Sequence, residues 1–432
     1  MIDWQTLDNS QRENLLQRPL LEDNEKLEGD VEKIIRVVKE SGDDALRVLT
    51  ARFDGVDLED IKVSQGEIDS AIQDLDQKVK DALDQAYQMI RRFHEAQVQE
   101  DVIVETAPGI ECRLRVRPLE AVGLYVPGGD TPLSSTALML GVPAQLADCP
   151  VKVLTSPPGR DGQMAPEIIY AASKCGIDSL YKTGGAQAIA AMAYGTETIP
   201  LVDKIFGPGN RFVTEAKRQV SQRLVGIDMP AGPSEVLVIA DKNASASFVA
   251  SDLLSQAEHG PDSQVVLLSD DLSLLQAVEL EVKIQLKSLS RWKIATEALK
   301  HARYIKVENI EQALEISNRY APEHLILNIQ DAENYLEQVM HAGSIFLGPW
   351  SPESAGDYAS GTNHVLPTYG YARFTDALSL KDFQKRSTVQ KLSREGLSGL
   401  SEAIIRIAKS EGLDAHARAV SLRLEGGQND LA

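Results

Sequence analysis

The order of apolar and polar positions divides the chain into a helical start, two alternating stretches and a helical end. In about the first hundred residues, apolar side chains recur at helical spacing over Val31–Thr50 and Ile68–Val98, so we expect helices there. His94 lies among charged residues of the second helix and is predicted to be exposed. Glu111–Pro118 alternates apolar and charged residues, which is typical of a strand.

Between residues 120 and 234, a strand-like run is followed four times by a turn, usually rich in glycine, and a helix. The predicted strands are 121–126, 151–155, 180–182 and 204–206, and the predicted helices are 133–146, 165–175, 186–194 and 211–220. This alternation indicates a parallel sheet. The glycine turns either hold phosphate at the following helix or are simply tight turns, and without a Gly-x-Gly-x-x-Gly motif both interpretations stay open.

The same alternation begins again at Glu235. Strands are predicted at 235–240, 264–269, 304–307, 325–329 and 344–347, and helices at 244–259, 272–286, 310–320 and 332–341. The predicted fold class is therefore α/β, with two incomplete Rossmann-like parallel-sheet domains facing a cleft. We expect four parts: a helical segment (1–119) folding with the second domain, a first α/β domain (120–234), a second (235–372), and a helical tail (373–432) that docks on a second subunit.

Two short motifs in the second α/β stretch suggest chemistry. Gln256 and His259 are three residues apart near a helix end, where the dipole favours a cation, although such a pair alone is more often an ordinary surface feature. Glu323 and His324 precede a strand. Helix ends and strand starts share one edge of a parallel sheet, so these four residues should meet. Neighbouring side chains on a strand point apart, so Glu323 and His324 share a site only if Pro322 turns the chain.

Further candidates lie toward the C-terminus. Residues 348–364 form a long irregular segment, which is typical of functional loops, and its Asp357 and His364 are either ligands, substrate contacts or surface residues. His416 is either a surface helix residue or a group delivered into the site of a partner subunit.

Composition narrows the class of partner and compartment. The net charge of −20 over 432 residues argues against nucleic acid or an anionic membrane as the main partner. Three scattered cysteines do not make a disulfide framework. The N-terminus has no secretory pattern and no apolar run reaches the length of a membrane span, so we expect a cytoplasmic protein.

Seven segments together are similar to the histidinol dehydrogenase family, in the family's order and over nearly the whole chain. They are Gly-Leu-Tyr-Val-Pro-Gly-Gly (123–129), Gly-Gly-Ala-Gln-Ala-Ile-Ala-Ala (184–191), Gly-Pro-Gly-Asn (207–210), Asp-Met-Pro-Ala-Gly-Pro-Ser-Glu (228–235), Gln-Ala-Glu-His-Gly (256–260), Ala-Pro-Glu-His-Leu (321–325) and Ser-Ala-Gly-Asp-Tyr-Ala-Ser-Gly-Thr-Asn-His-Val-Leu-Pro-Thr (354–368).

The resemblance implies oxidation of L-histidinol to L-histidine by way of L-histidinal, with two NAD reduced and one zinc bound per subunit of a homodimer. It implies zinc ligation and substrate contact by Gln256, His259, Asp357 and, across the interface, His416, and acid–base catalysis by Glu323 and His324. His324 would also contact substrate, as would Ser234, His364 and Glu411, the last supplied across the same interface. Tyr125, Gln187 and Asn210 would contact NAD.

The chemistry is compatible with these assignments. Alcohol oxidation needs a base such as His324, and aldehyde oxidation needs activated water, for which a partly buried Glu323 is suited. A rival route uses a thiolate of Cys149 or Cys175, but neither has a neighbouring histidine or basic cluster. Without the resemblance, the alternatives are a zinc-dependent hydrolase of a small cationic substrate and a non-enzymatic binding protein.

Overall fold

The computed structural model describes residues 1–18, 24–128, 132–222, 225–229 and 232–426. Gly129, Pro230 and Ala231, which belong to motifs named above, lie outside the described residues. The chain forms two compact units. The larger unit contains Met1–Gln97 and Leu119–Phe383, and the smaller contains Val98–Pro118 and Gln384–Ala432.

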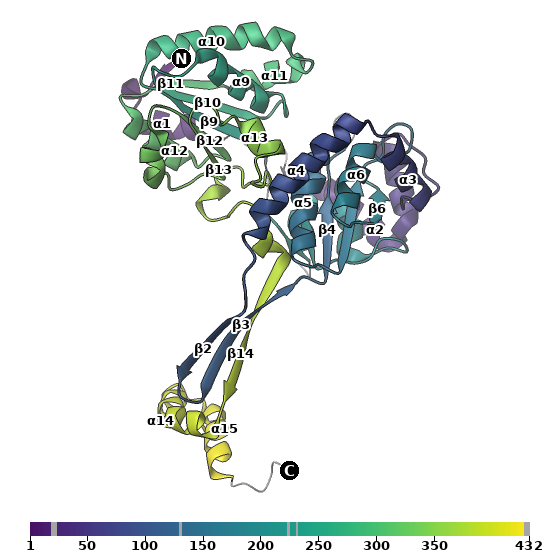
Figure 1. Cartoon of the computed structure of the whole chain (residues 1–432), viewed down its shortest axis with the longest axis vertical. Helices are drawn as coiled ribbons and strands as arrows, with labels where there is room; N and C mark the ends of the chain where they lie inside the picture. The colour runs from purple at the N-terminus through teal and green to yellow at the C-terminus, as the bar shows by residue number, and fades with distance from the viewer. Residues whose placement is uncertain (19–23, 129–131, 223–224, 230–231, 427–432) are drawn as a thin grey trace. The chain divides into compact units, whose positions relative to one another are not determined.

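The first α/β body of the larger unit is a parallel sheet in the order β6-β5-β4-β7-β8 with helices around it (Figure 1). Its strands are β4 (Ala121–Tyr125), β5 (Val151–Ser156), β6 (Ser179–Lys182), β7 (Lys204–Phe206) and β8 (Gly226–Ile227). Its helices are α5 (Ser134–Leu146), α6 (Pro166–Lys174), α7 (Gly185–Tyr194) and α8 (Arg211–Ser221). The predicted alternation is confirmed here.

The second α/β body is a parallel sheet in the order β1-β11-β10-β9-β12-β13. Its strands are β1 (Ile2–Asp3), β9 (Glu235–Ala240), β10 (Gln264–Ser269), β11 (Arg303–Lys306), β12 (His324–Asn328) and β13 (Ser344–Leu347). Its helical elements are α9 (Ala246–Ala257), α10 (Leu272–Gln285), η2 (Leu286–Ser288), α11 (Trp292–Leu299), α12 (Ile310–Tyr320), η3 (Ala332–Gln338) and α13 (Glu353–Tyr358), and η4 (Tyr371–Arg373) and η5 (Leu380–Phe383) follow in the chain. The α/β fold class is thus confirmed.

Three details of the second body differ from prediction. Helix α9 ends at Ala257, so His259 lies in the turn that follows rather than in the helix. The segment predicted as helix 332–341 is a 3₁₀ helix, η3, and only Ala332 in it is buried, so little packing supports a longer α-helix. Helix α11 was not predicted.

The N-terminal segment is shared between the two bodies. Strand β1, η1 (Trp4–Thr6) and α1 (Asn9–Leu16) fold with the second sheet, whose core contains Trp4. Helices α2 (Asn24–Phe53), α3 (Gln65–Asp74) and α4 (Gln77–Glu95) instead pack on the first body. The expectation that all of 1–119 folds with the second domain is therefore wrong beyond α1. Periodicity shows that α2 has an apolar face, but not that the small alanines of α7 allow it to pack there.

His94 is fully buried, contrary to the prediction of an exposed position. It lies four residues after Ile90 on the buried face of α4, and its Nδ1 is 2.8 Å from the Ile90 carbonyl oxygen. Its Nε2 is 3.5 Å from Nδ2 of Asn363. Burial lowers the pKa of His94, so a neutral ring is favoured.

The smaller unit is an antiparallel sheet in the order β14-β3-β2, followed by two helices (Figure 1). The strands are β2 (Val102–Ala107), β3 (Ile110–Pro118) and β14 (Gln384–Leu392), and the helices are α14 (Arg394–Ser410) and α15 (Asp414–Glu425). The prediction of a purely helical tail is wrong at β14. That strand is exposed at most positions, so its sequence carries no apolar alternation. Within the described residues, no helix combines the length and apolar character needed to cross a membrane.

Candidate active site

The larger unit contains a cavity of about 1040 Å³ lined by residues of both α/β bodies. The predicted site residues that line it are Asn210, Ser234, His259, Glu323, His324, Asp357 and His364. Tyr125, Gln187 and Gln256 are buried beneath the surface. Glu411 and His416 are exposed residues of the smaller unit. The structure therefore brings most of the predicted site residues to one cavity.

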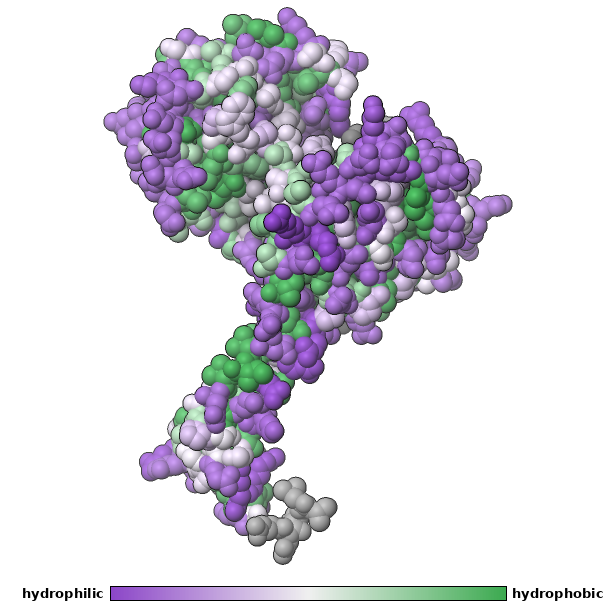
Figure 2. Space-filling model, viewed as in Figure 1, coloured by the Kyte–Doolittle hydropathy of each residue, from purple (hydrophilic) through white to green (hydrophobic). Residues whose placement is uncertain are grey.

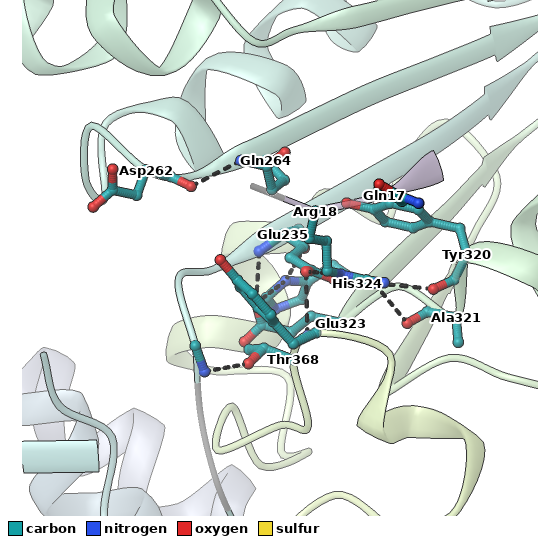
Figure 3. Close-up of polar contacts among 12 residues, drawn as sticks. Gln17, Arg18, Glu235, Asp262, Gln264, Tyr320, Ala321, Glu323, His324 and Thr368 are labelled. Atoms are coloured by element: carbon teal, nitrogen blue, oxygen red, sulfur yellow. Dashed lines mark hydrogen bonds and ion pairs between the residues drawn. The ribbon is translucent and has the colours of Figure 1, made fainter. Parts of the chain in front are cut away.

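The side chains of Glu323 and His324 are both anchored on the backbone of Glu235, in the adjacent strand β9 (Figure 3). The Glu235 N–H donates to Oε2 of Glu323 at 2.7 Å, and Nδ1 of His324 lies 3.0 Å from the Glu235 carbonyl oxygen. The turn that allows this is made at Ala321, whose φ of 53° ends α12, rather than by Pro322 alone. Two neighbouring residues thus reach one site.

A salt bridge supports this anchor from outside. Arg18 donates to both carboxylate oxygens of Glu235, with an Nη2–Oε2 distance of 2.7 Å. Arg18 also donates to the carbonyl oxygens of Tyr320 (2.9 Å) and Ala321 (3.3 Å), just before the Glu323–His324 pair. The Tyr369 N–H donates to the Glu235 carboxylate at 3.2 Å. Sequence reasoning missed Arg18 and Glu235 as site residues, since neither belongs to a recognisable spacing with the pair.

Potential metal ligands gather beside His324. His259, Glu353 and Asp357 each offer one ligand atom, and these atoms lie within 4.8 Å of one another. Asp357 lies 4.0 Å from Nε2 of His259 and 3.6 Å from Nε2 of His324. In the orientation that its hydrogen-bond partners require, the Gln256 amide nitrogen donates to the Glu235 carbonyl oxygen (3.2 Å) and to Oε1 of Glu353 (3.0 Å). The predicted convergence of Gln256, His259, Glu323 and His324 is confirmed.

Glu353 was not among the predicted site residues. It lies four residues before Asp357 in the short helix α13, a spacing that places both carboxylates on one side of a helix. That spacing in an otherwise irregular segment is the signal that could have found it.

The donor set fits a divalent transition metal. Imidazole nitrogen, carboxylate oxygen and amide oxygen are ligands that zinc accepts. Among the described residues, Nε2 of His324 and Oε2 of Glu353 are buried without a hydrogen-bond partner, so this position holds polar atoms that a nearby cation and a substrate would satisfy. Several carboxylates are also held close together away from water, and a cation would relieve their repulsion.

The same crowding shifts the pKa of the catalytic candidates. Burial raises the pKa of Glu323 to about 8. Burial acts to lower the pKa of His324, but the charges of Glu353, Glu323 and Asp357 outweigh it and raise that pKa to about 10. Burial likewise acts to raise the pKa of Asp357, and the nearby histidines hold it below its usual value. Asp357 therefore remains an anion, available to a metal.

His364 bridges the cavity between the two bodies. Its Nδ1 lies 2.8 Å from the Asp357 carbonyl oxygen and its Nε2 lies 3.0 Å from Oγ1 of Thr136, at the start of α5. A carbonyl oxygen only accepts, so Nδ1 carries the proton and the Thr136 hydroxyl donates to Nε2. Burial lowers the pKa of His364, which agrees with a neutral ring. Thr136 is a further site residue that the sequence reasoning missed.

The three predicted NAD contacts lie at the carboxyl edge of the first sheet. Tyr125 ends β4, Gln187 is in the first turn of α7 after β6, and Asn210 caps α8 after β7. The carboxyl edge is where open α/β sheets bind ligands.

The turn between β7 and α8 answers one open question about the glycine turns. Gly207 has φ of 123°, and a Cβ there would lie 2.1 Å from the Tyr125 carbonyl oxygen, so packing alone requires glycine. The Asn210 side chain accepts from the N–H groups of Phe212 (3.0 Å) and Val213 (3.2 Å), which occupies donors that a phosphate would use. At this position the tight-turn interpretation is favoured.

The cysteine route is disfavoured by burial. Burial raises the pKa of Cys149 to about 11 and that of Cys175 to about 12, which opposes formation of a thiolate. Neither residue lines the cavity.

Two parallel-sheet bodies around a cavity with an anchored Glu–His pair and a cluster of metal-type ligands define a two-domain α/β enzyme. The histidinol dehydrogenase family profile matches residues 17–424. Histidinol dehydrogenase of Colwellia psychrerythraea is 54% identical over 429 residues, 99% of each chain, and that of Yersinia pestis is 54% identical over 433 residues, 100% of this chain and 97% of that one. The crystal structure of histidinol dehydrogenase from Elizabethkingia anophelis matches with a TM-score of 0.94 and 48% identity, covering 98% of this chain and 97% of that one. The chain belongs to the histidinol dehydrogenase family.

The resemblance seen in the motifs is thereby confirmed, and the protein is an oxidoreductase of histidine biosynthesis. Membership of this class decides against the hydrolase and the non-enzymatic binding protein.

Proposed function

We propose that the protein oxidises L-histidinol to L-histidine by way of L-histidinal, in the cytoplasm, and reduces two NAD in each turnover. The observation that carries the proposal is the Glu323–His324 pair held on the backbone of Glu235 beside the His259–Asp357 ligand cluster. Full-length similarity to proteins named histidinol dehydrogenase supports the choice of L-histidinol as the substrate.

One zinc per subunit would be held by Gln256, His259, Asp357 and the partner subunit's His416. When bound, zinc supplies orientation, because it can bind the imidazole and amine of histidinol and fix the alcohol carbon. Ser234, His364 and the partner subunit's Glu411 would contact the substrate. Tyr125, Gln187 and Asn210 would contact NAD at the edge of the first sheet.

His324 serves as the base in alcohol oxidation. Its Nδ1–H donates to the Glu235 carbonyl oxygen, so Nε2 is the atom that can accept a proton. The substrate hydroxyl gives its proton to Nε2 while the adjacent carbon gives a hydride to NAD, and histidinal results. At a pKa of about 10 the ring would already be protonated at neutral pH, so a nearby cation, which would lower that pKa toward neutrality, is needed for Nε2 to act as a base.

Glu323 serves in aldehyde oxidation. Its buried carboxylate, with a pKa raised to about 8, takes a proton from water as the water oxygen adds to histidinal. The hydrated aldehyde then gives a second hydride to a second NAD, and the carboxylic acid is histidine. The two adjacent residues therefore divide the two half-reactions between them.

A homodimer would complete the site through the smaller unit. Strand β2 exposes Val102, Ile103 and Val104, each about half accessible. Because successive side chains of a strand face opposite sides, apolar side chains are exposed on both sides of this strand. Figure 2 shows hydrophobic surface over the strands of this unit. We propose that a second copy of the chain covers this surface and that the unit delivers His416 and Glu411 to its partner.

The proposal is tested by adding L-histidinol to the zinc-loaded protein with NAD. We expect two NADH and one histidine for each histidinol consumed, and loss of turnover after chelation of zinc that is reversed by adding zinc. Product formation without NADH, or one NADH with histidinal as the final product, would overturn it.

A further inference from the structure

Gln256 is an unusual ligand because its side-chain amide has two ends, an oxygen and an NH₂ group. The oxygen can ligate a metal, whereas the NH₂ group of nearly the same shape cannot. A histidine or carboxylate ligand does not present this choice in the same way. A metal site that uses Gln256 therefore needs neighbouring residues that hold the amide with its oxygen, and not its NH₂ group, toward the metal.

We propose that Glu353 is a positioning residue that orients the Gln256 amide so that its oxygen faces the bound metal. The inference rests on the proposed zinc site and deepens it. Nothing in the sequence reasoning assigned a role to Glu353, and its part is to act through Gln256 rather than on the substrate.

The contacts around Gln256 carry the argument. The amide orientation that its partners require places its nitrogen 3.0 Å from Oε1 of Glu353 and 3.2 Å from the carbonyl oxygen of Glu235, since the ionised carboxylate and the carbonyl oxygen both accept. Turning the amide over would place its oxygen against two acceptors. Gln256 and Glu353 have no exposed area, so water cannot compensate for such a clash. One orientation is thus enforced, and it leaves the amide oxygen for the metal.

Glu353 could instead be a ligand itself, since it belongs to the cluster with His259 and Asp357. Its Oε1 is already engaged by Gln256, and the zinc already has four proposed protein ligands besides the substrate that it would bind. We therefore assign it to the support of a ligand. Groups that hydrogen-bond to metal ligands typically change metal affinity by about 10–100-fold when altered.

The test measures zinc affinity in the full-length protein by competition with a chelator, together with zinc content. Glu353→Gln keeps the shape but can present either its oxygen or its NH₂ group, so residue 353 no longer selects one orientation of the Gln256 amide, and we expect the zinc dissociation constant to rise toward the lower end of the range of about 10–100-fold. Glu258→Gln is the matched control, because it makes the same change two residues from Gln256 at the end of α9, and we expect no change in affinity.

The decisive comparison repeats the substitution in a Gln256→Glu background. There, a carboxylate faces Glu353, and Glu353→Gln should now strengthen zinc binding, because it replaces repulsion with a donor. A reversal of sign between the two backgrounds supports orientation of Gln256. Weaker zinc binding in both backgrounds would show direct ligation by Glu353, and unchanged affinity in both would show no role; either result overturns the inference.

Two controls keep the result interpretable. Thermal unfolding of the metal-free variants reports whether the fold is intact, and Glu353→Asp replaces Glu353→Gln if the latter does not fold, because the shorter side chain no longer reaches Gln256. If the unsubstituted protein itself binds no zinc, the proposed function fails. If it binds zinc and the sign does not reverse, only the role of Glu353 fails.

Discussion

The guanidinium of Arg18 and the carboxylate of Glu235 form a buried, two-pronged ion pair within the second α/β body. Arg18 also packs on the ring of Tyr320, 4.0 Å from its centroid. The backbone of Glu235 holds both Glu323 and His324. Arg18, near the N-terminus, therefore supports the proposed catalytic pair indirectly, through Glu235.

Arg18→Met should therefore destabilise the protein and lower its turnover together. Removing one partner leaves the Glu235 carboxylate, which has no exposed side-chain area, without its counter-charge. We expect a loss of about 3–5 kcal/mol in the free energy of unfolding, measured by chemical denaturation. Arg18→Met with Glu235→Gln should recover part of that loss, since no unpaired charge remains. A double variant as unstable as the single one would contradict this account.

His324→Ala should cut turnover far more than it cuts zinc content. His324 is the proposed base but not one of the proposed zinc ligands, and its Nε2 has no hydrogen-bond partner among the described residues. General-base catalysis contributes about 10²–10⁴-fold, so we expect a loss of that order in kcat. Zinc content by mass spectrometry and NADH formation are measured on the same sample. Equal loss of both would remove the catalytic assignment.

Glu323→Gln should slow aldehyde oxidation more than alcohol oxidation. The amide can still accept from the Glu235 N–H but cannot take a proton from water. Water activation needs the ionised carboxylate, so in the parent the aldehyde step should quicken as pH rises, with a midpoint at or below the pKa of about 8, since a bound cation would lower it. The variant should lack this rise. Supplying histidinal directly isolates the step, and equal slowing of both half-reactions would count against Glu323.

Much of the site follows from sequence because the parallel sheet makes distant segments neighbours. Gln256, His259, Glu323 and His324 all lie where helices end and strands begin, and that rule alone places them on one edge. The pairing of Glu323 with His324 needed one further fact, the left-handed turn at Ala321, which no local pattern announces for an alanine.

The supporting residues could not be predicted for a different reason. Arg18 reaches Glu235 from a segment with no periodic relation to it, and its role depends on tertiary packing alone. His94 shows the same limit, because charged neighbours in sequence do not reveal which helix face is covered. Strand β14 pairs with β3 by backbone hydrogen bonds while most of its side chains are exposed, so apolar alternation could not reveal it.

Asp252→Asn should stabilise the protein at high pH but not at low pH. Burial raises the pKa of Asp252 from 3.8 to about 7, so ionisation opposes folding. Below about pH 4 the carboxyl is protonated in the folded and the unfolded protein alike, so its burial carries no ionisation cost. As pH rises from there to about 7 the carboxyl ionises more readily in the unfolded protein, so the free energy of unfolding falls. We expect a gain of about 2 kcal/mol for the variant at pH 8, less than full linkage would give because the buried amide of the variant also has a desolvation cost. Asp57→Asn, at an exposed position, is the control, and equal effects at pH 4 and pH 8 would contradict the prediction.

Mixing His416→Ala with His259→Ala should restore activity that neither variant has alone. If the partner subunit's His416 completes each zinc site, a mixed dimer has one site with both histidines intact and one site with neither. Random exchange makes half of the dimers mixed, and one of two sites in each is intact, so about a quarter of the parental activity should return. The subunits are exchanged by co-expression or by refolding together, and zinc content should rise in parallel. Two variants that both lose activity and show no recovery on mixing would place His416 in the site of its own subunit, and full activity in His416→Ala alone would remove it from the site altogether.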